Sequence, residues 1–389
     1  MQDRYPAFEY CIAGHDDTTG DGDSFVKSSI WDISLDGREN DDLHKIPPIT
    51  LGNYFLSAHK FLEGDNYSTL RKGLKYTLSC NVEVDEIKKI IICLVKHGPF
   101  YHPIKVTVIL KNKKLASFVL NGAISEAGLA TIENEYQNLD ELSSNKPEFQ
   151  TLIPKVFGIG FIPSNRREIG FFLGQWFEGF EEFHVVKTDN KVKVGILNKD
   201  DSFSLIPDST SFKIYEQASK ILTLYYDITS LKQISPWHHA AGDFIVKIKE
   251  EDVEVKLITV RRFNNLMESE DLFSGLFFFF LNLTLRMRMD RNRGTKEYIF
   301  FSKKVVPAII SGFTNGLKKN LKTDQKFYVK NPDFYDLFIE FIKEFDSKNL
   351  LNAFIMILGS YNKDTPEAEI IGKNLVDHAK VIFDSIQEL

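Results

Sequence analysis

The spacing of hydrophobic residues changes from irregular to helical along the first hundred residues. Residues 1–50 are polar and predict irregular structure, whereas residues 51–97 repeat apolar positions with the period of a helix. Within that stretch, residues 84–97 place apolar side chains along one broad face. Gly98 stands where a helix commonly ends. The pattern therefore predicts helical structure up to residue 97.

The pattern then changes to that of strands. Residues 104–110 are rich in β-branched side chains, and Asn112 with Lys113 suits a turn before the chain returns. The elements predicted up to residue 181 are a hairpin over 104–110 and 115–121, a helix over 129–142, strands over 154–161 and 168–177, and a connector over 178–181.

Beyond residue 180 the periodicity is mainly helical. A helix is predicted over 212–227, a short hairpin over 243–249 and 253–260, and helices from 266 to the end. Proline near the first turn marks the starts of two late helices, at Pro332 and Pro366. The order is therefore hairpin, helix, two strands, connector, helix, short hairpin and a helical remainder.

Composition narrows the class of protein. The 389 residues carry 48 basic and 54 acidic side chains, a net charge of −6, which argues against nucleic acid and anionic membrane as main partners. The 33 phenylalanines predict a large aromatic core. The longest apolar run, residues 272–281, is about half of the ~20 residues that span a bilayer, so it predicts a buried helix.

The cysteines and the N-terminus indicate the compartment. Cys11, Cys80 and Cys93 are widely spaced and form no CxxC pair, so neither a disulfide framework nor a zinc ribbon is expected. Residues 1–6 lack the apolar run of a signal peptide. These features predict a reducing, cytoplasmic location.

Two features of the sequence carry a family resemblance. One is the order of the predicted elements, and the other is the segment 236–246, Pro-Trp-His-His-Ala-Ala-Gly-Asp-Phe-Ile-Val. Over residues 104–330 the chain resembles the aminoglycoside phosphotransferase and choline kinase branch of protein-kinase-like folds. The resemblance implies an α+β fold with a small antiparallel sheet lobe and a larger helical lobe. The expected division is an N-terminal extension at 1–100, a small lobe at 101–180 and a helical lobe at 181–389.

The resemblance also implies positions for the nucleotide. In that family a strand lysine holds the ATP phosphates and pairs with a glutamate on the next helix. Here Asn121 falls near the lysine position, and Glu135 is the helix glutamate. The connector that accepts the adenine edge corresponds to Glu178 and Phe180. ATP with Mg²⁺ is the implied cofactor.

Residues 236–246 align with the family's catalytic loop. The alignment sets His238 at the catalytic aspartate, Asp243 at the metal-binding asparagine and Thr259 at the second metal ligand. A histidine can still accept a proton near pH 7, but a threonine hydroxyl is a poor substitute for a carboxylate on Mg²⁺. The same stretch resembles a group of bacterial proteins of unassigned activity.

Three functions follow from these substitutions. The first is group transfer to a small-molecule hydroxyl, with His238 as base and Asp243 holding a divalent ion. The second is a pseudokinase, a regulator or scaffold whose helical lobe binds a protein partner. The third comes from the pattern His-His-x-x-x-Asp, which resembles chloramphenicol acetyltransferase and condensation domains. There His239 would be the base and Asp243 the residue that holds the loop.

Arginines and aromatic residues give further candidates. Four arginines between Arg286 and Arg293 suit either a phosphorylated ligand or an internal ion-pair network. Aromatic residues from Trp176 to Phe183 suit base stacking or packing at the connector. His184 lies in the same region, and the sequence offers it no clear partner.

Overall fold

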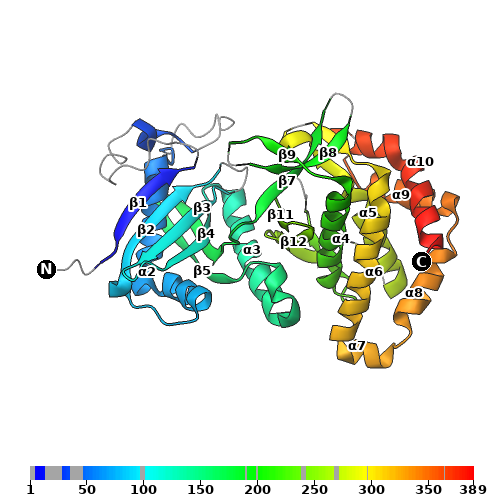
Figure 1. Cartoon of the computed structure of the whole chain (residues 1–389), viewed down its shortest axis with the longest axis horizontal. Helices are drawn as coiled ribbons and strands as arrows, with labels where there is room; N and C mark the ends of the chain where they lie inside the picture. The colour runs from blue at the N-terminus through cyan, green and yellow to red at the C-terminus, as the bar shows by residue number, and fades with distance from the viewer. Residues whose placement is uncertain are drawn as a thin grey trace. The chain divides into compact units, whose positions relative to one another are not determined.

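The computed structural model describes ten stretches of the chain: residues 5–13, 29–35, 47–96, 101–188, 191–198, 200–237, 242–266, 271–295, 297–362 and 364–389. The chain divides into two compact units. Unit 1 comprises Met1–Asn145 and Pro154–Glu178, and unit 2 comprises Lys146–Ile153 and Gly179–Leu389. Helices and mostly antiparallel sheets are combined, so the predicted α+β class is confirmed (Figure 1).

Unit 1 is built on one six-stranded sheet with the order β1-β2-β3-β4-β6-β5. Its elements are β1 (Ala7–Ile12), η2 (Ser29–Asp32), α2 (Leu51–Leu78), η4 (Val84–Glu86), β2 (Ile87–Leu94), β3 (Ile104–Leu110), β4 (Leu115–Ala123), α3 (Glu126–Asn145), β5 (Val156–Ser164) and β6 (Arg167–Gln175). The β1–β2 pair is parallel, and the other pairs are antiparallel. Segments from the predicted extension thus share a sheet with the predicted small lobe.

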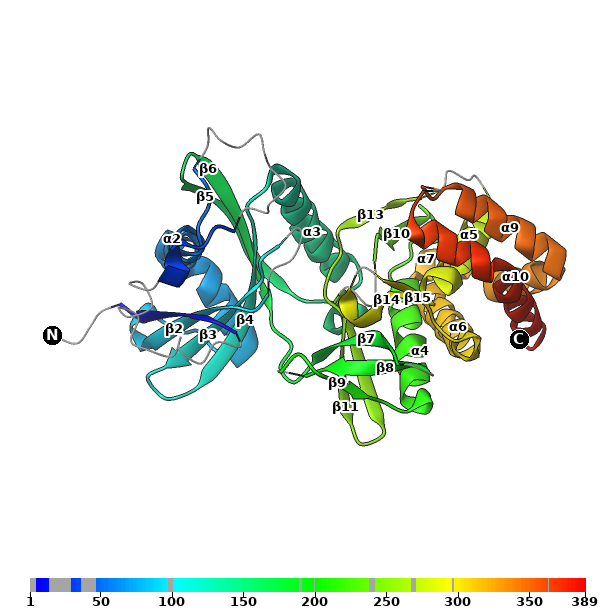
Figure 2. The same ribbon diagram turned by 90° about the horizontal axis from the view of Figure 1, so that it is seen from above.

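The two long helices of unit 1 cover opposite faces of this sheet (Figure 2). On the α2 face, a Cβ added to Gly73 would lie 2.7 Å from the Phe118 ring, so α2 approaches β4 closely. On the other face, the rings of Tyr136 on α3 and Phe172 on β6 lie 6.2 Å apart. Successive side chains of β4 and β6 point to opposite faces of the sheet, so these two strands contribute to the core under α2 and to the core under α3.

The helix predicted over residues 84–97 is wrong. Ile87–Leu94 is strand β2, paired with β1 on one side and β3 on the other. Ile90, Ile92 and Leu94 are buried at alternate positions, which is the period of a strand. A short run of isoleucines fits the period of a helix as well as that of a strand. Pairing with strands on both edges makes this segment a strand. Strand β1 likewise lies within a stretch predicted to be irregular.

Cys11 and Cys93 face one another across β1 and β2 as register partners and form a disulfide, with 4.4 Å between their Cα atoms. The expectation that the cysteines do not pair is therefore wrong for these two. Parallel pairing of strands 82 residues apart brings them together, which their spacing in the chain could not indicate.

Unit 2 combines a five-stranded sheet, ordered β12-β11-β7-β8-β9, with a helical layer. Its first elements are η5 (Pro147–Leu152), β7 (Glu181–Lys187), β8 (Val192–Leu197), β9 (Phe203–Leu205), α4 (Asp208–Leu224), β10 (Lys232–Ser235), β11 (Phe244–Lys249), β12 (Asp252–Leu257) and β13 (Arg262–Asn265). The predicted hairpin near residues 243–260 is confirmed, but β7, β8 and β9 were not foreseen. Residues 183–186 of β7 are all buried and its charged residues stand at the two ends of the strand, so β7 shows no alternation of apolar and polar positions.

The remaining elements of unit 2 are mainly helical, as predicted. They are α5 (Leu272–Arg286), β14 (Met289–Arg291), η7 (Asn292–Gly294), β15 (Tyr298–Phe300), η8 (Lys303–Val305), α6 (Val306–Thr323), α7 (Gln325–Lys330), α8 (Phe334–Lys343), α9 (Ser347–Gly359) and α10 (Pro366–Gln387). The apolar run lies in α5, whose Leu276, Phe280 and Leu285 are buried. Within the described ranges no helix has the length and apolarity needed to cross a membrane.

Glycines allow the closest helix contact of unit 2. A Cβ on Gly312 of α6 would lie 2.1 Å from the carbonyl oxygen of Glu216 on α4, and one on Gly316 would crowd Thr223. Residues four apart share one helix face, so both glycines face α4. The Ser219 hydroxyl also donates to the Ile309 carbonyl at 2.7 Å. The resulting α4–α6 pair is a fixed support for the hairpin β11–β12, since α4 also packs on β12.

Residues 146–153 belong to unit 2 although the chain on both sides belongs to unit 1. The Lys146 ammonium donates to the carbonyls of Leu224 at 2.6 Å and Tyr226 at 3.3 Å, and to Asn320 Oδ1 at 2.8 Å. The Tyr225 hydroxyl donates to the Phe149 carbonyl. Lys146 thus caps the C-terminal end of α4, and burial lowers its pKa to about 8.

A buried histidine joins α10 to α5 and to the residue before β14. The Arg288 guanidinium donates to His378 Nδ1 at 2.9 Å, and His378 Nε2 lies 3.3 Å from Thr284 Oγ1. The Thr284 hydroxyl donates to the Leu281 carbonyl, so this network assigns the proton of the neutral imidazole to Nε2. Burial and the Arg288 charge lower the pKa of His378 well below 6.5.

We predict that this histidine makes unit 2 less stable in acid. Below about pH 6.5 the unfolded chain takes up a proton at His378 and the folded chain does not, so the free energy of unfolding falls by about 1.4 kcal/mol per pH unit. Urea unfolding at pH 7.5 and 5.5 measures it. The control is His378→Gln, which keeps an acceptor for Arg288 but does not titrate. An equal acid loss in wild type and variant would contradict the assignment.

Candidate functional site

The turn that leads into β11 holds a buried carboxylate. Asp243 is 1% exposed, and Arg261 donates to both of its oxygens, at 2.9 Å from Nη1 and 2.8 Å from Nη2. The Asp243 carbonyl also accepts from the Ile258 amide at 2.8 Å. A two-fork guanidinium–carboxylate pair is among the strongest side-chain interactions. Asp243 therefore ties the start of β11 to the segment that follows β12.

The residue before Asp243 is a glycine in the left-handed conformation. Gly242 has φ of +75°, a conformation that favours glycine, and a Cβ added there would lie 2.9 Å from the Glu182 carboxylate. Glu182 is on β7, which pairs with β11 at Ile245↔Glu182. The Glu182 side chain therefore lies directly against the Gly242–Asp243 turn.

His184, left without a partner by the sequence, follows Glu182 by two residues on β7. Its Nε2 atom is 3.7 Å from the Glu182 carboxylate, its ring packs edge-on against Phe203, and the residue is 6% exposed. Glu182, His184, Gly242, Asp243 and Arg261 are called the Asp243 site below. It brings an imidazole, two carboxylates and a guanidinium into one region of unit 2.

The start of the same loop is held by an arginine. Trp237 is 4% exposed, and Arg286 Nη2 donates to its carbonyl at 3.4 Å. Arg286 also donates to the Tyr361 hydroxyl at 3.0 Å and to Glu367 at 3.3 Å. Arg288, another of the four arginines between Arg286 and Arg293, binds His378. These contacts favour the internal network over a phosphate site.

The predicted catalytic histidines, His238 and His239, lie outside the described residues. The two predicted metal ligands are described. Thr259 is half-buried two residues before Arg261, and Asp243 is paired as above. Within the described stretches no three His, Cys, Asp or Glu side chains are arranged to hold a metal ion. Each oxygen of the Asp243 carboxylate accepts one N–H of Arg261, so the positive charge next to this carboxylate comes from the protein's own guanidinium.

The predicted nucleotide-binding residues fall in different units. In unit 1, Asn121 is on β4 opposite Phe172, on the face that α3 covers. Glu135 on α3 is 1% exposed, and the Tyr101 hydroxyl donates to it at 2.5 Å. Neither Tyr101 nor its contact with Glu135 was foreseen, since the phenol comes from the segment before β3.

The two connector residues have cationic neighbours. Lys105 lies 3.2 Å from Glu178 in unit 1. Partial burial opposes ionisation of Glu178, but a hydrogen bond with Ser117 and the charge of Lys105 outweigh it and lower its pKa. In unit 2, the ammonium groups of Lys247 and Lys256 lie 5.5 and 5.6 Å from the Phe180 ring centre. Phe180 is therefore packed in a cation–π arrangement.

The sequence did not identify the partners that complete the Asp243 site. The sequence did not predict that Arg261 pairs with Asp243, and Glu182 was not singled out. Ionic pairs across two strands and a loop have no fixed spacing in the chain. The only available signal was the position of an arginine directly after a short apolar strand.

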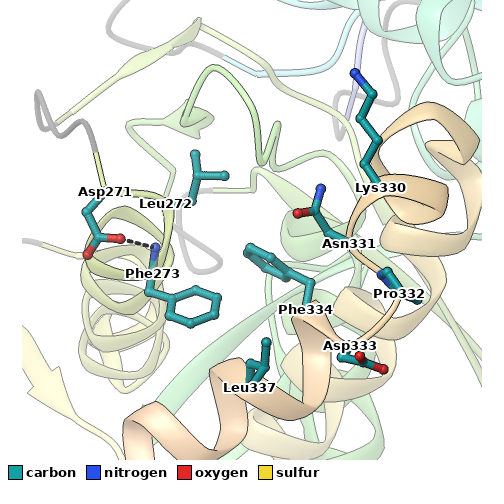
Figure 3. A pocket seen from close by; sticks show the side chains of 9 residues that line it. All are labelled: Asp271, Leu272, Phe273, Lys330, Asn331, Pro332, Asp333, Phe334 and Leu337. Carbon is teal, nitrogen blue, oxygen red and sulfur yellow. Dashed lines mark hydrogen bonds between the residues drawn. The ribbon is translucent and has the colours of Figure 1, made fainter.

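An aromatic groove occupies another part of unit 2. It has a volume of about 500 Å³ (Figure 3), and its lining is Asp271, Leu272, Phe273, Lys330, Asn331, Pro332, Asp333, Phe334 and Leu337. The rings of Phe273 and Phe334 are 5.0 Å apart. Asp271 caps α5 by accepting from the amides of Phe273 and Ser274. The described lining contains none of the predicted site residues.

Comparison of the chain with protein-family models and with curated proteins finds no match.

We predict that Gly242→Ala destabilises unit 2. The left-handed φ costs about 1–2 kcal/mol for a residue with a side chain, and the clash with Glu182 adds to it. The additional Glu182→Ala change should recover the steric part and leave the backbone part. Chemical denaturation measures all three variants. Gly359→Ala is the matched control in the same unit, because its Cβ would meet nothing within 4 Å. Equal effects of the two glycine substitutions would refute this account.

Proposed function

We propose that this chain is a kinase-like binding protein or regulator that does not carry out metal-dependent phosphate transfer. The observation that carries the proposal is the two-fork pair between Arg261 and Asp243. In the family that the sequence resembles, this position binds the metal on ATP. Here an internal guanidinium supplies the positive charge that a metal ion would bring.

The order of elements in unit 1 supports the kinase-like part of the proposal. In protein kinases the phosphate-binding lysine is on the third strand, and its glutamate partner is on the helix that follows. Strands β2, β3 and β4 form a meander, α3 follows, and β5 and β6 complete the sheet. Asn121 is on the third strand of that meander, and Glu135 is on the next helix.

The same comparison supports the loss of phosphate transfer. Asn121 has no charge to place on phosphate oxygens. Glu135, which would pair with the missing lysine, instead accepts from Tyr101. Each of the two carboxylates retained from the family pattern is thus bonded to a neighbour inside its own unit.

A second candidate function draws on the same ion pair. In the acyltransferases with the pattern His-His-x-x-x-Asp, the aspartate holds the loop, and Asp243 holds its turn through Arg261. Against this candidate, β11 begins directly after Asp243, where those enzymes have glycine and then a helix. Acyl-CoA binding, together with loss of acyl transfer in His239→Ala alone, would favour this function.

The proposal predicts how nucleotides and metals affect thermal stability. Wild-type protein should show no thermal shift that requires both ATP and Mg²⁺ or Mn²⁺. Arg261→Gln frees the Asp243 carboxylate, so Mn²⁺ alone should stabilise that variant. At a hundredfold excess over the dissociation constant, the gain would be about 2.7 kcal/mol.

Two controls make this test decisive. The double variant Arg261→Gln/Asp243→Asn removes the freed carboxylate and should lose the Mn²⁺ response. Arg261→Lys keeps a charge but not the fork, and separates loss of charge from loss of geometry. Breaking a buried pair costs about 3–5 kcal/mol, so circular dichroism must first show that each variant is folded. A metal-dependent ATP shift in wild type that disappears in Asp243→Asn would overturn the proposal.

A further inference from the structure

Strand β1 is attached to the sheet of unit 1 along one side. It is an edge strand, and each of its six residues has its register partner on β2 (Figure 1). Tyr10 is the only buried residue among these six. By contrast, β2 has four buried residues and pairs with β3 on its other side. The core of unit 1 therefore depends little on β1.

Two polar contacts add to the attachment of β1. The Tyr10 hydroxyl lies 2.7 Å from His59 Nδ1 on α2, and the Lys89 ammonium donates to the Glu9 carboxylate at 2.6 Å. The side chains of Lys89 and Glu9 are 28% and 35% exposed, and ion pairs that reach solvent add little stability. Segments with few buried apolar contacts are the ones that open locally. Without a covalent link, β1 is therefore held weakly.

The disulfide between Cys11 on β1 and Cys93 on β2 supplies that link. While this bond is intact, β1 cannot separate from β2. Neither cysteine is fully buried, and disulfides that reach solvent exchange more readily with thiols. The sequence predicts a reducing compartment, where a protein disulfide is usually transient and responds to oxidants. The position of the bond on a weakly held edge strand thus suits control by thiol–disulfide exchange.

We propose that the Cys11–Cys93 disulfide is a redox switch that determines whether β1 covers the edge of β2. In the oxidised state β1 stays paired with β2. In the reduced state β1 separates, and the amides of β2 that faced it become open to solvent or to another strand. The switch lies in unit 1, whereas the Asp243 site lies in unit 2, so this inference goes beyond the proposed function.

The redox partner of the switch is a dithiol. One thiolate of the dithiol attacks a sulfur of the disulfide, the protein S–S bond breaks, and a mixed disulfide forms. The second thiolate of the dithiol then attacks the dithiol's own first sulfur and releases the protein. Two electrons pass to the protein, the two protons of the dithiol end on the sulfurs of Cys11 and Cys93, and the dithiol becomes a cyclic disulfide. An oxidised dithiol drives the reverse reaction.

The test compares the full chain before and after treatment with dithiothreitol under native conditions. Alkylation of the unfolded protein with iodoacetamide, followed by mass spectrometry, counts the thiols in each state. Of the three cysteines, Cys80 is the one outside the disulfide, so one alkylated site is expected before reduction and three after it. Hydrogen exchange of peptides that cover β2 and β4 then measures the opening of the sheet.

Reduction should make exchange in β2 about tenfold or more faster, because the cross-link no longer holds β1 in place. Exchange in β4 should stay unchanged, since β4 pairs with β3 and β6. The variant Cys11→Ser/Cys93→Ser should show the fast exchange with or without dithiothreitol. Cys80→Ser is the matched control and should keep the response of the wild type.

Three outcomes would overturn the proposal. The first is three alkylated sites before reduction, which would mean that the disulfide does not form in the folded protein. The second is equal exchange of β2 in the oxidised and reduced states. The third is equal acceleration of β2 and β4, which would make the disulfide a general stabiliser of unit 1. None of these measurements involves metal or nucleotide, so failure here is distinguishable from failure of the proposed function.

Discussion

A carboxylate buried as deeply as that of Asp243 is stable only when a cation and hydrogen-bond donors compensate for the lost water. Arg261 provides this compensation through two nearly equal bonds, to Oδ1 and Oδ2. The pair joins the start of β11 to the segment after β12. It therefore fixes the turn at Gly242, against which the Glu182 side chain lies. The charge of the Asp243 carboxylate is therefore balanced by a side chain of the protein itself, the Arg261 guanidinium.

The segments that carry the Arg261–Asp243 pair are held in place by close approach of backbone segments as well as by side-chain contacts. Gly242 allows the Glu182 carboxylate to lie against the turn, and Gly312 with Gly316 allows α6 to approach α4. Close α4–α6 packing holds α4, and α4 in turn packs on β12. Small residues at a few positions thus determine where the ionic groups meet. A Cβ added to Gly242 or Gly312 would lie within 3 Å of the Glu182 carboxylate or the Glu216 carbonyl oxygen, and one added to Gly316 would lie within 3 Å of the Thr223 side chain.

The spacing of apolar residues predicted the correct element where it fitted only one period, that of a helix or that of a strand. The hairpin β3–β4, the helix α3 and the hairpin β11–β12 were expected and are present. Expectations failed where a short run fitted two periods, as in β2, and where a strand shows no alternation of apolar and polar positions, as in β7. Pairing with neighbouring strands decided both cases. At the site, Asp243 was identified from its motif, but its partner Arg261 and its neighbour Glu182 were not.

The sequence by itself determined which segments alternate and which repeat as helices, how charge is balanced, and that a carboxylate stands at position 243. These properties depend on residues close together in the chain. Only the tertiary structure decided that Arg261 neutralises Asp243, that Tyr101 bonds Glu135, that His184 lies against Glu182 and that Cys11 meets Cys93. Most of these contacts join different elements, and all of them depend on strand register or backbone path. A hydrogen bond or ion pair requires atoms within about 3–4 Å, and spacing along the chain does not encode that distance.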